Sequence, residues 1–211
     1  MPQEALLREI KALQNNGTAP KFIERYNDFK SFAQKSEEEW FSELCFCLLT
    51  ANSSADSGIK MQNALGFDGF YNLPKKELTG RLKELGYRFY NRRAEFIVGA
   101  RKHFGIKKKV SEFADGRAAR TYLVENVKGL GYKEASHFLR NTGFDNVAIL
   151  DRHILRIMNE HGIIQKIPAH LTGKNYLEFE AALDKFAEKA KVNHSLLDLY
   201  LWYLKTGKIL K

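Results

Sequence analysis

The sequence has little cysteine, and this excludes several kinds of site. Cys45 and Cys47 are the only cysteines among the 211 residues. Two thiols cannot complete a four-cysteine iron–sulfur cluster or a zinc knuckle. Side chains two residues apart on a helix point in different directions, so no disulfide is expected between the two. We therefore predict that both are small core residues of a protein kept in a reducing compartment.

Long apolar runs are missing as well. No segment approaches the length that a membrane-spanning helix needs. The first residues, MPQEALLREIKALQ, are charged and amphipathic, unlike those of a secretory signal. We expect a soluble, intracellular protein of the cytoplasm or nucleoid that has no membrane partner.

Acidic residues are in the minority, and the excess of positive charge favours a polyanionic partner. The 34 basic and 25 acidic side chains give a net charge of +9. Between residues 87 and 109 basic and aromatic side chains alternate, which suits phosphate contacts beside stacking or wedge residues. A solvated helix face over an aromatic core would give a similar pattern, so this region alone does not distinguish a nucleic-acid-binding surface from an ordinary helix.

Alternating strand patterns are scarce, and helical spacing of apolar residues is common, so the fold is predicted to be all-α. Ser36 followed by three glutamates is typical of a helix start. Glycines 66, 86, 105, 143, 162 and 207 suit stops between helices. Apolar spacing outlines a first helix around 5–13, a second around 22–32 and a third from Ser36 through about 48. The other predicted helices span about 56–65, 75–85, 89–104, 116–124, 132–140, 151–160, 174–191 and 194–205.

The most informative segment is ENVKGLGYKEA, residues 125–135, which joins two helical patterns. Gly129 and Gly131 permit close backbone approach, so a tight hairpin can turn Leu130 inward. Its outward amides would then lie at the positive end of the next helix, where a DNA phosphate binds well. Two glycines alone fit an ordinary corner with a glycine C-cap equally well.

The whole segment resembles the helix-hairpin-helix of the base-excision DNA glycosylase superfamily. The resemblance implies a two-lobed helical fold with a cleft between the lobes. Residues 1–35 with 147–211 would form one lobe, and 36–146 the other, with the helix-hairpin-helix at about 117–140. It also implies that backbone carbonyls near Glu125, Val127 and Leu130 can hold a monovalent cation that bridges to phosphate.

Members of this superfamily with lyase activity carry a lysine two residues after the second hairpin glycine, which is Lys133 here. An aspartate follows in a motif similar to apolar-Asp-x-His-apolar, and here it is Asp151 in ILDRHIL. A neutral lysine amine can attack the sugar C1′ and form a Schiff base, and a carboxylate can stabilise the positive charge that develops on the sugar. Taken singly, the two residues would be a surface lysine and a helix N-cap.

Two neighbouring residues each have two interpretations. Lys128 is the competing lysine, but its place in the hairpin turn suits a phosphate better than a sugar carbon. His153 matches a residue that recurs in the superfamily, and a packed core histidine would fit the sequence as well.

Length, chain end and the segments at 48–55, 87–94 and 126–141 resemble the compact archaeal-type 8-oxoguanine DNA glycosylase/lyase family. That family ends in a lysine whose terminal carboxylate helps to recognise 8-oxoguanine, so Lys211 is the matching candidate. An acceptor is chemically apt, because 8-oxoguanine has an N7 hydrogen that guanine lacks. Trp202 is a candidate to stack on the extruded base, and a place in the core would fit the sequence equally well. Arg88 and Phe89 are candidates to fill the gap in the duplex or to contact the estranged partner base, with a packed aromatic as the alternative.

The resemblance therefore implies a monomeric glycosylase/lyase that removes 8-oxoguanine from double-stranded DNA and requires no cofactor. The absence of four cysteines argues against the iron–sulfur branches that act on oxidised pyrimidines and misplaced adenine. One alternative is a non-catalytic helix-hairpin-helix module that grips DNA. Another is a glycosylase of the same fold that acts on a different damaged base.

Overall fold

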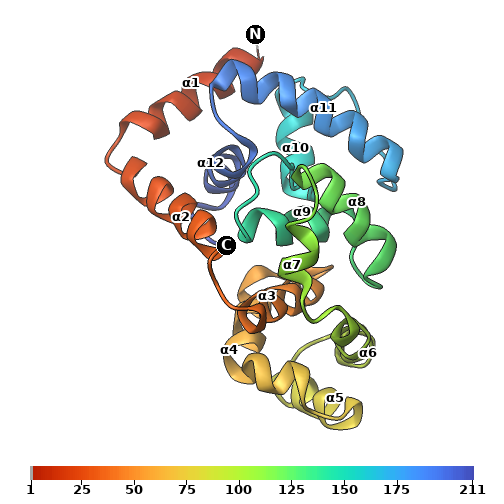
Figure 1. Ribbon diagram of the computed structural model, residues 1–211. Helices are drawn as coiled ribbons and strands as arrows, with labels where there is room; N and C mark the ends of the chain where they lie inside the picture. Colours follow the sequence, from red (N-terminus) through yellow and green to blue (C-terminus); the bar gives the residue numbers. More distant parts are fainter. Residues whose placement is uncertain (1) are drawn as a thin grey trace.

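The computed structural model describes residues 2–211, and over that range it is all-helical (Figure 1). This confirms the predicted fold class. The elements are α1 (Pro2–Asn15), α2 (Ala19–Phe32), α3 (Glu37–Thr50), α4 (Ala55–Tyr71), α5 (Lys75–Glu84), α6 (Tyr90–Ala100), the 3-10 helix η1 (Arg101–His103), α7 (Ile106–Val110), α8 (Gly116–Asn126), α9 (Tyr132–Asn141), α10 (Arg152–Glu160), α11 (Gly173–Ala190) and α12 (His194–Thr206).

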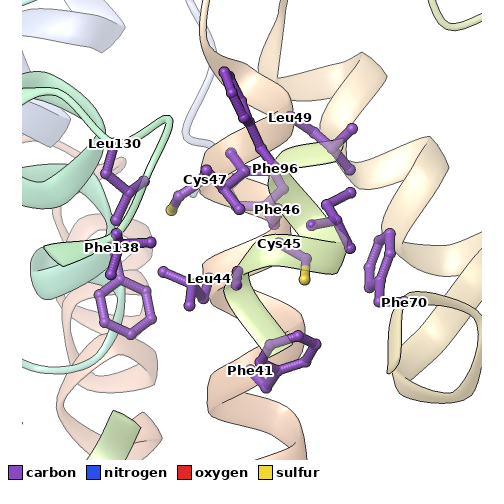
Figure 2. Close-up of a cluster of buried hydrophobic side chains, with 14 of the residues drawn as sticks. Phe41, Leu44, Cys45, Phe46, Cys47, Leu49, Phe70, Phe96, Leu130 and Phe138 are labelled. Atoms are coloured by element: carbon purple, nitrogen blue, oxygen red, sulfur yellow. The ribbon is translucent and has the colours of Figure 1, made fainter. Parts of the chain in front are cut away.

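Two separate hydrophobic clusters form the core. One is built from buried residues between Trp40 and Val147, and Figure 2 shows part of it around α3. The other combines residues from the two ends of the chain, Leu6 to Phe29 and Ala148 to Leu201. Figure 1 shows the corresponding arrangement, with α1, α11 and α12 at one end of the molecule and α4 and α5 at the other. The chain therefore leaves one core and returns to it.

These clusters change over close to residues 35 and 147, where the sequence places the boundaries between lobes. We keep the division into lobes 1–35 with 147–211 and 36–146 as a proposal, which the two clusters support. In this division α9, which carries Lys133, packs in one lobe, and α10, which follows Asp151, packs in the other.

A buried ion pair joins the two clusters. Arg120 on α8 makes a bidentate pair with Glu180 on α11, with both N–O distances 2.6 Å and both side chains almost fully buried. Glu180 also accepts a hydrogen bond from the amide of Ala148. Burying two charges costs desolvation free energy, and this cost is offset only when the remaining polar atoms of the pair also have hydrogen-bond partners, as most have here. The arrangement fixes the first helix of the hairpin motif against the opposite lobe.

Local sequence explains how α3 begins and how its first turn reaches α7. Ser36 and Glu39 form a reciprocal capping box at the start of α3. The carboxylate of Glu37 accepts from the amides of Lys107 and Lys108, at 3.1 Å each, and so caps the N-terminus of α7. Lys107, Lys108 and Lys109 thus lie in a short helix that periodicity did not predict.

Two predicted helices have different bounds in the structure. The helix expected to stop near residue 65 is interrupted there, since Gly66 has non-helical backbone angles (φ 59°, ψ −169°), and a further helical segment up to Tyr71, which buries Phe70, was not predicted. The helix expected to span 89–104 ends at Ala100 and continues as η1. Both cysteines are free and fully buried, as predicted, and burial raises the pKa of each thiol well above its usual value. Among residues 2–211 no helix has the length and apolarity to cross a membrane.

Candidate active site

The hairpin between α8 and α9 has the geometry that its glycines indicate. The side chain of Leu130 is buried, and Figure 2 shows it beside Phe138 and near Cys47. Its amide donates to the carbonyl of Val127, which closes the turn. Within the described residues, the amides of Gly129 and Gly131 donate to no protein acceptor. They are therefore free to bind an anion at the start of α9.

The two hairpin glycines are needed for different reasons. Gly129 has φ +99°, and a Cβ there would lie 2.4 Å from Cδ2 of Phe96. Gly131 has φ −93°, an ordinary value, and it serves as the N-cap of α9 without a side chain. Only Gly129 therefore requires glycine for its backbone conformation.

We expect Gly129→Ala to lower the free energy of unfolding by about 2–5 kcal/mol, the sum of left-handed strain and overpacking against Phe96. Gly86→Ala is the matched control, since Gly86 has φ +82° but open space around it. The control should lose only the strain, about 1–2 kcal/mol. Urea unfolding measures both, and equal losses in the two variants would contradict the role assigned to Phe96.

Lys133 lies in the first turn of α9, directly after the hairpin. Its side chain is 25% exposed, and its Nζ lies 3.3 Å from Oε1 of Glu134, which is less exposed. The amine is thus accessible from solvent but positioned by a neighbouring carboxylate.

Asp151 is the N-cap of α10, which is the role expected for this residue when it is taken singly. Its Oδ1 accepts from the amides of His153 and Ile154, at 2.8 and 2.9 Å. These bonds fix the carboxylate at the positive end of a helix while the residue stays partly exposed. The capping role therefore orients the acid and does not compete with a role in chemistry.

Asp198 on α12 was not identified from the sequence. The charges of Lys133 and Asp151 both act on its carboxyl group. Burial raises the pKa of the Asp198 carboxyl to about 6, Arg140 and Lys133 lower it, and Asp151 raises it further. Arg140 Nη2 lies 3.3 Å from Asp198 Oδ2, and both side chains are largely buried. This ion pair joins α12 to α9, which carries Lys133, and the contact between His153 and Trp202 joins α12 to α10, which Asp151 caps.

The raised pKa of Asp198 predicts how stability depends on pH. Its carboxyl binds a proton more readily in the folded protein than in the unfolded chain. The protonated carboxyl of Asp198 therefore adds to the free energy of unfolding. This contribution is fully present below about pH 4 and is lost as pH rises through about 6. We expect the unfolding free energy of the wild type, minus that of Asp198→Asn, to fall by about 3 kcal/mol over this window. Denaturant titrations at several pH values measure it, and a pH-independent difference would contradict the prediction.

Two candidate residues, one on α10 and one on α12, lie together. The rings of His153 and Trp202 meet edge to face, with centroids 5.3 Å apart. Nδ1 of His153 and Nε1 of Trp202 are buried, and neither has a hydrogen-bond partner within residues 2–211. Buried polar atoms are normally paired, so these two atoms mark a place where a bound polar molecule would be stabilised.

The chain end lies close to α9. The side chain of Lys211 contacts α3 and α4, and its charge, like that of Lys133, lowers the pKa of His137. Burial is the main cause of that lowering, and the backbone of Lys211 acts in the opposite direction. Lys211 is thus placed near the helix that carries Lys133.

The remaining candidates surround the hairpin. Lys128 is highly exposed and pairs with Glu95 at 2.8 Å, which lowers the pKa of Glu95. Arg88 is exposed, and its guanidinium stacks 4.6 Å from the centroid of the Phe89 ring. A hollow of about 490 Å³ is lined by Lys75, Asn91, Arg92, Glu95, Phe96 and Lys128. It belongs to the surface beside the hairpin and has neither Lys133 nor Asp151 in its lining.

An all-helical fold with this hairpin, a lysine in the following turn and an aspartate capping the next helix defines a helix-hairpin-helix DNA glycosylase. A family model described as 8-oxoguanine DNA glycosylase matches residues 22–192. The chain therefore belongs to the 8-oxoguanine DNA glycosylase family. It is 52% identical to the 8-oxoguanine DNA glycosylase/AP lyase of Methanocaldococcus jannaschii, over 98% of this chain and 99% of that protein.

Solved structures agree with this assignment. One is the M. jannaschii 8-oxoguanine glycosylase/lyase in complex with a 15mer DNA containing 8-oxoguanine, with a TM-score of 0.95 and 51% identity over 98% of this chain and 100% of that one. Another is the 8-oxoguanine DNA glycosylase of Thermotoga maritima, with a TM-score of 0.92 and 46% identity over 99% and 100%.

Proposed function

We propose that this protein removes 8-oxoguanine from double-stranded DNA and then cleaves the strand at the resulting site, with Lys133 as nucleophile. The chain is a DNA glycosylase/AP lyase, as its relatives of 45–52% identity are. The observation that supports the site best is the placement of Lys133 in the first turn of α9, directly after the hairpin, together with the carboxylate of Asp151 held as the N-cap of α10.

The reaction follows from these positions. The neutral amine of Lys133 attacks C1′, and the bond between C1′ and the base breaks, with its electron pair leaving on the base, which takes up a proton. The sugar ring then opens, and the nitrogen bound to C1′ becomes a protonated Schiff base. Loss of a proton from C2′ converts the Schiff base to an enamine. The enamine electrons then expel the phosphate at C3′ and restore a conjugated, protonated Schiff base, which water hydrolyses to release Lys133. Each step conserves electrons, and no oxidant is needed.

Asp151 has an electrostatic role in this scheme. Positive charge builds on the sugar as the base departs, and a fixed carboxylate stabilises it more than a mobile one would. The capping bonds from His153 and Ile154 keep the carboxylate in place before the reaction begins. Trp202 is proposed to stack on the everted base, and its edge contact with His153 holds the indole ring for this role.

The hairpin is proposed to hold the DNA backbone. Gly129 and Gly131 offer free amides, Lys128 offers an exposed ammonium group, and Arg88 with Phe89 would fill the space left by the everted nucleotide. The carbonyls of Glu125, Val127 and Leu130 suit a monovalent cation, because Glu125 lies in the last turn of α8, where carbonyls lack helical partners. Such a cation would add positive charge next to a phosphate.

We further propose that the enzyme acts as a monomer and needs no iron–sulfur cluster. The thiols of Cys45 and Cys47 are enclosed in the core, and two thiols cannot supply four ligands.

Duplexes that each carry one lesion test the proposed function. We expect release of free 8-oxoguanine and a nick at its position, and much slower reaction at oxidised pyrimidines or misplaced adenine. Tight, salt-sensitive binding to every duplex without any base release would instead indicate a non-catalytic DNA-binding module. Preferred release of another damaged base would indicate a glycosylase of the same fold for that lesion.

A further inference from the structure

The backbone that leads into Asp151 lies outside the helices. Residues 147–150 follow α9 and precede α10 in irregular structure, and all four are buried. Buried backbone amides and carbonyls need hydrogen-bond partners, and a segment outside regular structure must find them elsewhere in the molecule. The position of Asp151 relative to α9 therefore depends on the side chains that supply these partners.

Two side chains of α11 supply them. The hydroxyl of Tyr176 donates to the carbonyl of Ala148 at 2.6 Å and accepts from the amide of Leu150 at 3.1 Å. Glu180, on the next turn of α11, accepts from the amide of Ala148 at 2.8 Å. The side chains of Tyr176 and Glu180 are each only 2% exposed, so solvent does not compete for these bonds. Three backbone groups just before Asp151 are thus held by α11.

Tyr176 also contacts the helix that carries Lys133. Its hydroxyl lies 3.2 Å from Oγ of Ser136, which is on α9, one turn after Lys133. The centroid of its ring lies 5.3 Å from that of Tyr132, which directly precedes Lys133. Tyr176 therefore bridges α9 and the backbone that ends at the N-cap of α10.

The bridge is itself held in place by the buried ion pair between the lobes. The guanidinium of Arg120 pairs with Glu180, donates to Ser136 at 3.2 Å, and lies 5.4 Å from the centroid of the Tyr176 ring. Burial raises the pKa of the Tyr176 hydroxyl above its ordinary value, so this group stays a neutral donor at neutral pH. Both the ring and the hydroxyl of Tyr176 are thus fixed.

We propose that Tyr176 is a positioning residue of the enzyme, which sets the place of the Asp151 carboxylate relative to the amine of Lys133. This rests on the proposed function, in which these two groups carry the chemistry. Tyr176 is buried and acts only through the backbone before Asp151. Electrostatic stabilisation requires a charge that is in place before the reaction begins, and a displacement of about an ångström can cost about 100-fold in rate.

Tyr176→Phe tests the proposal, because phenylalanine keeps the ring and removes only the hydroxyl. We expect single-turnover release of 8-oxoguanine, at saturating enzyme, to slow about 10- to 100-fold, with unchanged affinity for the damaged duplex. In an Asp151→Asn background the same change should alter the rate by no more than about twofold, because the charge that Tyr176 positions is then absent.

Ser136→Ala breaks the bridge from the side of α9 and serves as a second variant. The bonds from Tyr176 to the backbone remain, so we expect a smaller effect, a slowing of base release by about 3- to 10-fold, as for the loss of one hydrogen bond. This effect too should vanish in the Asp151→Asn background.

Tyr26→Phe is the matched control. The hydroxyl of Tyr26 donates to Asp145 at 3.0 Å, in the same connection between α9 and α10 but farther from Asp151. This variant should release 8-oxoguanine at the wild-type rate.

Release at the wild-type rate by Tyr176→Phe would overturn the proposal. Equal slowing by Tyr176→Phe with and without the Asp151 charge would also overturn it, because it would indicate general structural damage. If Tyr176→Phe failed to fold, a wild-type rate in Ser136→Ala would be the contradicting result. A wild-type protein that releases no 8-oxoguanine would instead defeat the proposed function itself.

Discussion

Lys133→Gln is expected to abolish strand cleavage at 8-oxoguanine, with a loss of about 1,000-fold or more, because glutamine has no amine to attack C1′. The side chain of Lys133 is only 25% exposed, and its replacement has nearly the same length, so the fold should be retained. Binding of the damaged duplex should persist, since the hairpin amides and the basic residues around them are untouched. Gel assays of single-turnover cleavage measure the rate, and binding titrations measure the affinity.

Lys128→Gln is the control for this experiment. Lys128 lies five residues earlier, in the hairpin, and pairs with Glu95 on the surface. Its loss should weaken DNA binding and reduce the dependence of binding on salt, with little change in the rate of the bound complex. A reversal of the two results, with cleavage lost in Lys128→Gln and kept in Lys133→Gln, would refute the assignment of the nucleophile.

Asp151→Asn is expected to reduce the rate of base release by about 100- to 1,000-fold, as the loss of one fixed electrostatic stabiliser commonly does. Asparagine caps a helix about as well as aspartate. The bonds from His153 and Ile154 can therefore persist, and the substitution removes the charge with little disturbance of the helix. Single-turnover measurements of base release, made at saturating enzyme, report the chemical step.

Asp115→Asn is a matched control on the same chain. Asp115 caps α8 with one carboxylate oxygen that accepts from the amides of Arg117 and Ala118, the same pattern as at Asp151. The two variants should lose similar, small amounts of stability, and only Asp151→Asn should lose activity. Equal rates of base release in the two variants would show that Asp151 serves only as a cap.

The hairpin, Lys133 and the position of Asp151 at a helix start could be predicted because each depends on neighbours in sequence. The tight hairpin turn itself requires a positive φ at Gly129, and Asp151 accepts hydrogen bonds from the amides two and three positions later. The bounds of most helices follow for the same reason. The stop at Gly66 was predicted, but the short helical segment that follows it to Tyr71 was missed, because it depends on burial of Phe70 in the core.

The residues that connect the site to the core could not be placed from sequence. Glu43 contacts Asn141 and Lys211, which are 98 and 168 residues away along the chain. Asp198 and Arg140 meet only when α12 packs near α9. A signal was nevertheless present, because Glu43 and Asp198 are single charges within runs of apolar residues. A buried charge needs a partner, but its identity depends on the tertiary structure.

Reduction by borohydride during reaction with an 8-oxoguanine duplex, followed by proteolysis and mass spectrometry of the trapped complex, tests the nucleophile most directly. A Schiff base at the proposed site predicts one nucleotide-modified peptide, with the modification on Lys133. Attachment to Lys128 or to any other amine, or base release with no trapped complex at all, would contradict the mechanism.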